Sequence, residues 1–365
     1  MTFNITGIGT AVPPFSIGQP EAARAWAALV GLDDKRTRAT EALYRRSRIR
    51  KRHTVYLEGP GDPGTGEGAF FGPAKTAGDP GPTTEDRMKR FEAEAPGLAH
   101  RAAQDALAEA GVDAGQITHL VTVSCTGFFA PGPEMALIEK LGLPPTVERT
   151  NVGFMGCHGS LNGLRVAASF SGADPGAQVL MASVELCSLH MSYDWSPDAT
   201  VANSLFADGA AAVVGMAQGD QGRPGAWRLA SSGTCRLPDS ADAMTWKIGN
   251  NGFRMTLSAT VPEIIRRELR GWTEGWLAKA GLGVDQVESW AIHPGGPRIL
   301  SSAAEALGLS PQDNTVSTEV LADFGNMSSA TILFTLQRLR AQDAPRPCVA
   351  MAFGPGLVVE AALFV

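Results

Sequence analysis

The chain has 365 residues, 44% of them apolar, which is enough for a large core and for either two ordinary domains or one large duplicated one. It has no run of about eighteen apolar residues, and its start lacks an export signal, so we expect a cytoplasmic protein that does not enter the membrane. A formal net charge of −6 argues against a general nucleic-acid-binding protein.

One basic segment, residues 44–53 (YRRSRIRKRH), departs from this acidic balance. A solvated helix face and a phosphate-binding surface both account for it. Residues 58–83 follow, rich in glycine and proline and almost without periodicity. A stretch of this kind is either a functional cover or a mobile insertion.

The cysteines are few and widely separated. They stand at positions 125, 157, 187, 235 and 348, without CxxC or Cys/His spacing. The sequence therefore predicts neither a disulfide framework nor a zinc or other metal site.

Two stretches of the chain repeat at an offset of 170 positions. Residues 106–123 (ALAEAGVDAGQITHLVTV) and 276–293 (WLAKAGLGVDQVESWAIH) each read as a helix, a glycine stop, a short loop and a buried strand. The same offset relates residues 178–183 (QVLMAS) to 348–353 (CVAMAF). Because two separate matches share one offset, the sequence predicts a duplicated fold.

Each half carries a further helix between its matched strands. The pattern predicts that this helix begins at Cys157 in the first half and near Asn326 in the second. Subtracting 170 from 326 gives 156, so the thiol and the amide occupy nearly equivalent helix N-termini. Strands that alternate with helices favour mainly parallel sheets covered on both faces, hence a layered α/β fold.

Cys157 combines features that a cysteine nucleophile needs. A free thiol is mostly protonated at neutral pH, but a helix N-terminus and a nearby imidazole both favour the thiolate. His158 is adjacent, yet neighbouring side chains on a starting helix diverge by about 100°, so it need not face the thiol. His293 is the better partner, because it ends a buried strand before a Pro-Gly-Gly turn that a ligand can approach closely. Asn326 would add a second donor for a developing oxyanion or enolate.

Each of these residues also has an ordinary structural explanation. A lone cysteine is usually a core residue, a histidine at a strand end is usually hydrogen-bonded within the core, and asparagine beside glycine is common in turns. Their joint placement at element ends in a duplicated frame favours the catalytic interpretation.

Four motifs resemble a known family. GCHGSLNGLRVA, AIHPGGPRIL, DFGNMSSATILF and AFGPGLVVEA are similar to the chalcone synthase family, the type III polyketide synthases of thiolase-like fold. The resemblance covers nearly the whole chain, from TGIGTAVPP to GPGLVVE. HPGG, GNMSSA and the final FGPG separate this family from the initiating ketoacyl-carrier-protein synthases, which share the cysteine, histidine and asparagine.

The resemblance implies a duplicated thiolase-like fold with α-β-α-β-α layers and two mixed, mainly parallel sheets. It divides the chain into an N-terminal half, 1–220, and a C-terminal half, 221–365. It also implies the chemistry: an acyl group from acyl-CoA loads onto Cys157, malonyl-CoA loses CO₂, and the enolate held by His293 and Asn326 attacks the thioester. Repeated condensation and cyclisation follow, and no cofactor is needed because decarboxylation supplies the carbanion.

Substrate-binding residues are implied in the same way. Arg46 matches a cation at the mouth of the CoA tunnel, where a guanidinium suits phosphate, and Gly295 and Gly296 complete the CoA-binding set. A homodimer is implied too, with Ala130 where the family has a residue that crosses the interface. The substrate pocket implied by the resemblance comprises Cys125, Thr126, Cys187, His190, Trp246, Met255, Ser328 and Phe353.

Several pocket positions differ from those of plant members of the family. Cys125, Cys187 and His190 replace threonines, Met255 replaces a gate phenylalanine, and Trp246 replaces a glycine that lines the cyclisation cavity. An apolar, sulfur-lined pocket accepts an alkyl chain more readily than a hydroxylated aromatic ring. We therefore expect a fatty acyl starter and a resorcinol, pyrone or related product.

Three other functions remain open on the residues alone. One is a single-condensation ketoacyl synthase of the initiating type that uses a carrier protein, which repeated extension from malonyl-CoA alone would exclude. Another is a Cys-His-Asn hydrolase, which the duplicated α/β layers argue against. The third is a non-catalytic binding protein, in which Cys157→Ser would leave the activity intact.

Overall fold

The computed structural model describes residues 3–76, 78–217 and 227–365. Its main sheet has nine strands in the order β11-β12-β13-β8-β1-β7-β6-β4-β5, so both halves of the chain contribute to it. In chain order the strands are β1 (Phe3–Ala11), β4 (His119–Ser124), β5 (Glu148–Gly153), β6 (Gln178–Leu186), β7 (Asp208–Met216), β8 (Trp227–Arg236), β11 (Ser289–Ile292), β12 (Cys348–Gly354) and β13 (Val358–Phe364).

The two halves of the sheet share one topology. In the first half β4 runs parallel to β6, β6 antiparallel to β7, and β7 antiparallel to β1. In the second half β11 runs parallel to β12, β12 antiparallel to β13, and β13 antiparallel to β8. Strands β4 and β11 begin 170 positions apart, and so do β6 and β12. The predicted duplication is confirmed.

Two details differ from the predicted pair of mainly parallel sheets. Strands β1 and β8 pair antiparallel and thereby join both halves into one sheet. Within the described residues, three pairings of this sheet are parallel and five are antiparallel. The link between β12 and β13, residues 355–357, illustrates one cause of the antiparallel pairing. A parallel crossover needs about a dozen residues, so a link this short can only join the two strands as an antiparallel hairpin.

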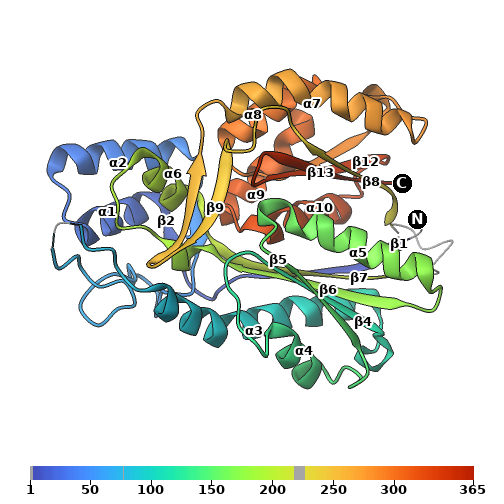
Figure 1. Ribbon diagram of the computed structural model, residues 1–365, viewed down its shortest axis with the longest axis horizontal. Coiled ribbons are helices and arrows are strands. Elements are labelled where there is room, and N and C mark those ends of the chain that lie inside the picture. The colour runs from blue at the N-terminus through green and yellow to red at the C-terminus, as the bar shows by residue number, and fades with distance from the viewer. Residues whose placement is uncertain (1–2, 77, 218–226) are drawn as a thin grey trace.

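The elements stack in alternating layers of helices and strands, so the layered α/β fold is confirmed (Figure 1). Two helices cover the outer face of each half of the sheet, and further helices lie between the two halves. The helices α3 (Thr84–Ala110) and α4 (Pro133–Leu141) cover the first half of the sheet. The helices α7 (Val261–Ala278) and α8 (Pro297–Leu307) cover the second half. The middle layer contains α5 (Gly159–Ala173) and α10 (Thr331–Ala341), and α9 (Thr315–Phe324) lies beside α10.

Helix α3 shows how small residues bring the layers together. Thr83 and Asp86 form a capping box at its start, and Gly111, in the left-handed region, ends it. The helix packs on β1 through an alanine-rich face, where a Cβ on Gly7 would lie 2.2 Å from the carbonyl oxygen of Ala106. Gly7 has no side chain, so the backbone of the helix can lie directly against the strand at this point.

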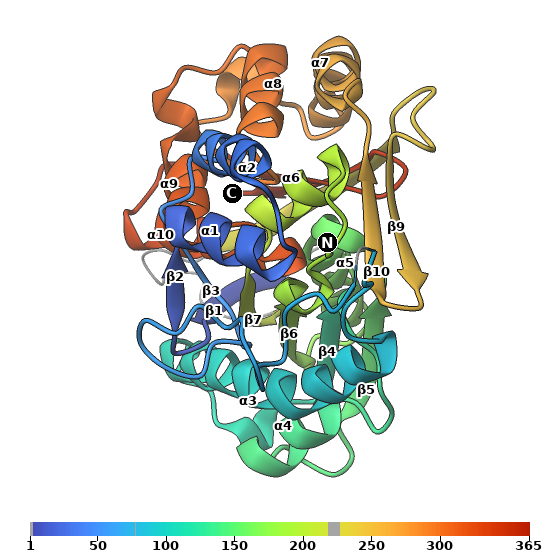
Figure 2. The ribbon, with the colours of Figure 1, turned by 90° about the vertical axis from the view of Figure 1, so that its left-hand side faces the viewer.

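The remaining elements gather at one end of the layers (Figure 2). Strands β9 and β10 form a hairpin of their own. None of the helices in the described ranges is both long and apolar enough to cross a lipid bilayer. The expected boundary between the halves, at residues 220 and 221, lies outside the described residues. The elements at this end are β2 (Ser16–Gly18), α1 (Gln19–Leu29), α2 (Asp34–Arg46), β3 (Lys51–His53), α6 (Pro197–Leu205), β9 (Met244–Gly249) and β10 (Gly252–Leu257).

Candidate active site

The three predicted catalytic residues lie at the ends of elements. Cys157 is in a 3₁₀ turn, Gly156–His158, between β5 and α5. Asn326 follows α9 and precedes a second 3₁₀ turn, Ser328–Ala330, which leads into α10. His293 directly follows β11. Both helices begin a few residues later than predicted, but the two turns contact each other, so equivalent positions of the two halves meet.

Two hydrogen bonds hold the Asn326 amide in one orientation. Its Oδ1 accepts from the backbone N–H of Ser328 at 2.8 Å, and its Nδ2 donates to the carbonyl of Gly295 at 3.3 Å. Its backbone bonds to Leu205 and Ala207, both at 2.9 Å, and the residue is buried. The second hydrogen on Nδ2 is directed at the Cys157 side chain, which forms a hydrogen bond with this amide, so a ligand oxygen would take the place of that bond.

The His293 imidazole is 1% exposed, and among the described residues neither of its ring nitrogens has a hydrogen-bond partner. Burial and, to a smaller extent, the nearby His158 lower its pKa to about 3. The ring is therefore neutral at pH 7, with one donor and one acceptor nitrogen. Because a buried polar group without a partner costs about 1–3 kcal/mol, the arrangement suits a ring that bonds to a substrate.

The Cys157 thiol forms hydrogen bonds with the side chains of Ser328 and Asn326. These bonds favour the thiolate, but burial opposes it more strongly and the Glu185 carboxylate adds to that effect, so the pKa of Cys157 rises to about 11. The thiol is thus protonated at neutral pH. This differs from our expectation that a helix N-terminus and an imidazole keep it ionised.

Cys157 lines a small cavity of about 30 Å³, and a larger cavity of about 1050 Å³ adjoins it. Cys187, Phe206, Trp246 and Met255 line both cavities and so form the wall between them. Six of the predicted pocket residues line the same small cavity as Cys157: Cys125, Thr126, Cys187, Trp246, Met255 and Ser328.

Trp246 forms much of this wall. Its Nε1 donates to the carbonyl of Cys125 at 2.8 Å, and its ring meets those of His190 and Phe253 nearly edge-on, with centroids 5.5 and 5.7 Å away. The Cys125 Sγ in turn lies 3.1 Å from the Ser328 Oγ. The indole therefore occupies space in the cavity that Cys157 lines, which a glycine at this position would leave open.

His190 has a structural role although it lines the large cavity. Its Nε2 donates to the carbonyl of Thr126 at 2.7 Å, and its Nδ1 accepts from the backbone N–H of Phe253 at 3.0 Å. Burial lowers its pKa to about 3, so the ring is neutral. Both nitrogens are committed to holding β10 against the neighbouring loop, which leaves only the apolar ring surface for a substrate.

The predicted role of Phe353 in the substrate pocket stays a prediction. Within the described chain it lines neither cavity, and it is 2% exposed. Its ring packs with Ile292, Leu300 and Leu357 in the core of the second half. It lies in β12, and its side chain belongs to the core of the second half.

Two residues of the site were missed from the sequence. Phe206, just after α6, lines both cavities. Glu185, in β6, is fully buried and accepts hydrogen bonds from the Cys125 backbone at 3.0 Å and the Thr126 hydroxyl at 2.6 Å. A single acidic residue in the apolar strand QVLMASVEL is the signal that could have indicated Glu185, because buried carboxylates are rare without a specific role.

The predicted CoA-binding residues Arg46, Gly295 and Gly296 line neither of these cavities in the described part of the chain. Arg46 is exposed at the end of α2. Gly295 belongs to the catalytic cluster, since a Cβ there would lie 3.5 Å from the His293 ring. Their role in CoA binding stays a prediction. The basic residues that do line the large cavity are Arg36, Arg52, Lys75 and Arg254.

The glycine- and proline-rich segment contributes to the large cavity. Residues 73–76 and 78–80 line it. Phe71, in the same segment, is fully buried and packs edge-on against Tyr56, with ring centroids 5.2 Å apart. These contacts favour the functional cover over the mobile insertion. Across the described ranges, no group of three or more His, Cys, Asp and Glu side chains is placed to bind a metal ion.

Comparison with known proteins gives consistent results along the whole chain. The family model for the N-terminal domain of chalcone and stilbene synthases matches residues 2–218, and the model for their C-terminal domain matches residues 228–365. An α-pyrone synthesis polyketide synthase-like protein, Pks18, from Mycobacterium tuberculosis is 34% identical over 99% of this chain and 90% of its own length. The 1,3,6,8-tetrahydroxynaphthalene synthase of Streptomyces peucetius is 38% identical over 72% of this chain and 71% of its own.

Solved structures agree with the fold. The polyketide synthase PKS-I of the brown alga Ectocarpus siliculosus superimposes with a TM-score of 0.92 at 32% identity, covering 100% of this chain and 98% of its own. The C-terminal type III polyketide synthase domain of Steely1 from Dictyostelium gives a TM-score of 0.89 at 29% identity, covering 100% of this chain and 99% of its own. The similarity therefore extends to both halves and their arrangement.

Proposed function

Because the chain belongs to the chalcone and stilbene synthase family, the type III polyketide synthases, we propose that Cys157 is its nucleophile and that His293 and Asn326 are its two donors. The enzyme is an acyltransferase that condenses acyl-CoA with malonyl-CoA. The match to both family models along the chain favours this activity over a single condensation on a carrier protein.

Loading of the starter begins at the Cys157 sulfur. The sulfur attacks the thioester carbonyl of acyl-CoA, the bond to the CoA sulfur breaks, and the thiol proton passes to the departing CoA. His293 carries this proton, because its neutral ring has an acceptor nitrogen that no described residue engages. Since the thiol pKa is about 11, the proton leaves as the substrate is attacked and not beforehand.

Extension uses the same two donors. Malonyl-CoA loses CO₂, the electrons of the broken C–C bond form an enolate, and Asn326 Nδ2 and the N–H of His293 donate to its oxygen. The enolate carbon then attacks the acyl thioester, the C–S bond breaks, and the Cys157 sulfur leaves and regains a proton. The donors bind the oxygen most strongly when it is negative, so they lower the barrier.

One observation carries this proposal: the His293 ring, buried without a partner among the described residues, adjoins an Asn326 amide of fixed orientation. Gly295 connects the two, because its carbonyl accepts from Asn326 while its Cα lies against the imidazole. A structural histidine at this depth would use its nitrogens, as His190 does. Two donors of the second half, next to a thiol of the first half, suit a transient anion.

The starter that we propose is a fatty acyl group, and the product a resorcinol, pyrone or related ring. A cavity of about 30 Å³ holds little more than one water molecule, so an acyl chain on Cys157 extends through the wall into the larger cavity. The wall offers sulfur atoms and aromatic rings but no hydroxyl group from its four residues, Cys187, Phe206, Trp246 and Met255. Such a lining favours an alkyl chain over a hydroxylated ring.

We also propose that two copies form a dimer through the surface near Ala130. Phe128, two residues from Ala130, is 40% exposed, and Met155, two residues before Cys157, is 38% exposed. A second copy would cover this apolar surface. Sedimentation of the wild type and of Phe128→Asp tests this. A cytoplasmic location stays a prediction.

The catalytic proposal is tested with malonyl-CoA and a panel of acyl-CoA starters. Cys157→Ser should abolish condensation, while His293→Gln and Asn326→Ala should reduce CO₂ release from malonyl-CoA by about 10²–10³-fold. Mass spectrometry of the products should show a long-chain acyl-CoA used in preference to an aromatic one. Condensation that survives Cys157→Ser would refute the assignment of the nucleophile, and preference for the aromatic starter would refute the fatty acyl proposal.

A further inference from the structure

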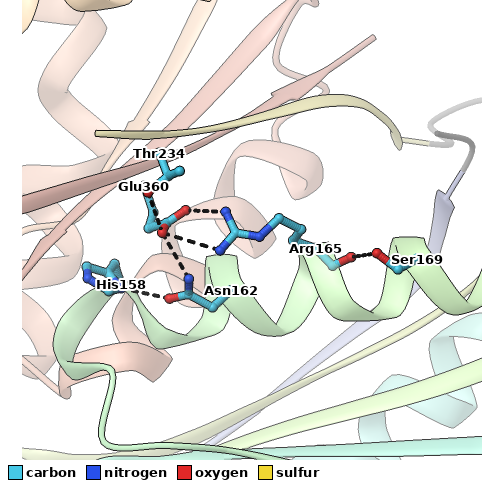
Figure 3. A network of polar contacts seen from close by, with 6 residues as sticks. All are labelled: His158, Asn162, Arg165, Ser169, Thr234 and Glu360. Carbon is cyan, nitrogen blue, oxygen red and sulfur yellow. Dashed lines mark hydrogen bonds and ion pairs between the residues drawn. The ribbon is translucent and has the colours of Figure 1, made fainter. Parts of the chain in front are cut away.

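His158, the residue after the nucleophile, belongs to a buried polar network that the mechanism above does not use (Figure 3). Its Nδ1 lies 2.7 Å from the Oδ1 of Asn162, and the Nδ2 of Asn162 lies 3.0 Å from Glu360. Glu360 also accepts from Arg165 at 2.7 Å and from Thr234 at 2.9 Å. His158, Asn162 and Glu360 are each at least 96% buried. The network therefore runs from the nucleophilic turn, along α5, to β13 and β8 of the second half.

The direction of each hydrogen bond follows from the charges. Glu360 is paired with Arg165 and surrounded by donors, so its oxygens only accept. Asn162 must therefore donate its Nδ2 to Glu360 and turn its Oδ1 toward His158. His158 in turn must carry a hydrogen on Nδ1, which leaves Nε2 as the acceptor nitrogen of the neutral ring. The ion pair between Arg165 of α5 and Glu360 of β13 thus determines the tautomer of His158, the residue after Cys157.

The residues on both sides of Cys157 are packed against the turn between β12 and β13. A Cβ on Gly354 would lie 2.3 Å from His158 Cδ2 and 2.5 Å from Nε2, so the ring rests on the glycine backbone. A Cβ on Gly156 would lie 2.3 Å from Pro355 Cδ. Gly156 has a φ of +76°, which side-chain-bearing residues rarely adopt. The nucleophile is thus held between two contacts with consecutive residues of the other half.

We propose that His158 is a positioning residue for the condensation: the Arg165–Glu360–Asn162 chain orients its ring against Gly354, and the ring holds the Cys157 sulfur in line with the donors of the second half. This proposal rests on Cys157 as the nucleophile. It gives a function to a histidine that sequence reasoning set aside because adjacent side chains diverge. His158 does not meet the substrate, because its Nδ1 is bonded to Asn162 and its other edge faces Gly354.

The electrostatics agree with this placement. His158 contributes to the lowered pKa of His293, so the two imidazoles are close enough to interact. Burial lowers the pKa of His158. The hydrogen bond to Asn162 and the Glu360 carboxylate oppose this effect, and the Arg165 guanidinium adds to it. A neutral ring beside His293 keeps the catalytic histidine free of a permanent positive neighbour.

Positioning has a large kinetic effect. A displacement of about 1 Å at a reacting atom can cost about 10²-fold in rate. His158→Phe keeps a ring of similar size against Gly354 but cannot donate to Asn162. His158→Gln keeps a donor for Asn162, and Asn162→Leu removes the link to Glu360 while His158 stays. A matched control is His119→Phe, since His119 is also buried but stacks on Phe170, away from the site.

The measurements are kcat and KM for condensation of an acyl-CoA starter with malonyl-CoA, the rate of Cys157 alkylation by iodoacetamide followed on its own peptide, and the melting temperature. We expect His158→Phe and Asn162→Leu each to lower kcat by about tenfold or more with KM within about twofold, and to change the alkylation rate. His158→Gln should restore most of kcat. The double variant His158→Phe/Asn162→Leu should be no slower than either single one, because both break one chain.

Some results would overturn the proposal. They are a lower melting temperature with unchanged kcat, multiplicative losses in the double variant, or a kcat loss in His119→Phe as large as in His158→Phe. The outcome is distinguishable from failure of the proposed function, because alkylation of Cys157 reports its positioning whether or not condensation occurs. If Cys157→Ser remains active, the proposed nucleophile is wrong; if it is inactive while His158→Phe is fully active, only the positioning role is wrong.

Discussion

The backbone N–H of Ser328 donates to the side-chain carbonyl of Asn326 at 2.8 Å, and this bond decides which end of the amide faces the substrate. Ser328 has a φ of +48°, in the left-handed region, so the turn that makes the bond is itself uncommon for a residue with a side chain. The same serine lies beside both Cys125 and Cys157. One turn therefore orients the donor and contacts the nucleophile.

Asn326→Asp separates the two functions of this amide. An aspartate still accepts from Ser328, but it offers no N–H to an enolate and places an oxygen near the carbonyl of Gly295. We expect CO₂ release from malonyl-CoA to fall by about 10²–10³-fold while the protein stays folded by circular dichroism. Asn151→Asp, which changes an asparagine bonded to Thr122 in the sheet, is the control and should keep its activity. Near-normal decarboxylation in Asn326→Asp would exclude Asn326 as a donor.

Glu185→Gln should make the nucleophile more reactive. The carboxylate contributes to the raised pKa of Cys157, so its neutralisation should lower that pKa from about 11. More thiolate is then present at pH 8, and alkylation by iodoacetamide should be faster by about tenfold, equivalent to about one pKa unit. The pH profile of alkylation measures this directly. Glu274→Gln, at an exposed ion pair in α7, should leave the profile unchanged, and an unshifted profile in Glu185→Gln would contradict the assignment.

Trp246→Gly should change the product. The indole separates the two cavities, so its removal joins about 30 Å³ beside the nucleophile to the 1050 Å³ beyond. We expect products with one or more additional malonyl-derived units, identified by mass spectrometry. Trp246→Phe keeps an aromatic wall and loses only the hydrogen bond to Cys125, so its product should stay that of the wild type. An unchanged product from the glycine variant would show that the wall does not limit chain length.

Stability should fall as the pH drops below about 6.5, because burial lowers the pKa of His190 and of His293 to about 3 each. The sign follows from proton counting: between pH 6.5 and 3 the unfolded chain binds these protons and the folded chain does not, so acid favours unfolding. Each such histidine contributes up to about 1.4 kcal/mol per pH unit to the slope. Urea unfolding at pH 7.0 and 5.5 measures it. His190→Phe should be less stable at pH 7 but show a shallower slope, and an equal slope would disprove the buried neutral state.

The duplicated frame was visible in the sequence because it recurs at one offset, and that offset brought Cys157 and Asn326 to equivalent turns, as in the structure. The joining of the halves through β1 and β8 was not visible, since strand pairing depends on contacts more than 200 positions apart. The side chain of Phe353 shows a related limit of sequence motifs. Its motif adjoins the site, but the pleat of β12 directs its side chain into the core.

His158 shows the limit of local reasoning most clearly. The divergence of neighbouring side chains indicated only that it need not face the thiol. The network that holds it extends through Asn162 to Glu360, 198 positions from Asn162, and no local pattern predicts that contact. Glu185 carried a local signal, an acid within an apolar strand. Phe206 carried none, because an aromatic residue before a buried strand is ordinary until a cavity is seen on each side of it.

The hairpin of β12 and β13 contacts both neighbours of Cys157 in the chain, Gly156 and His158, and this matters for the order in which the active site forms. The first half supplies the thiol and the helix that follows it, and the contacts on both sides of the thiol come from the second half. In the proposed mechanism acyl transfer needs the second half, which supplies His293, Asn326 and the hairpin, so we expect the first half alone not to consume thioesters. The thiol should therefore become able to transfer acyl groups only when the two halves have packed together.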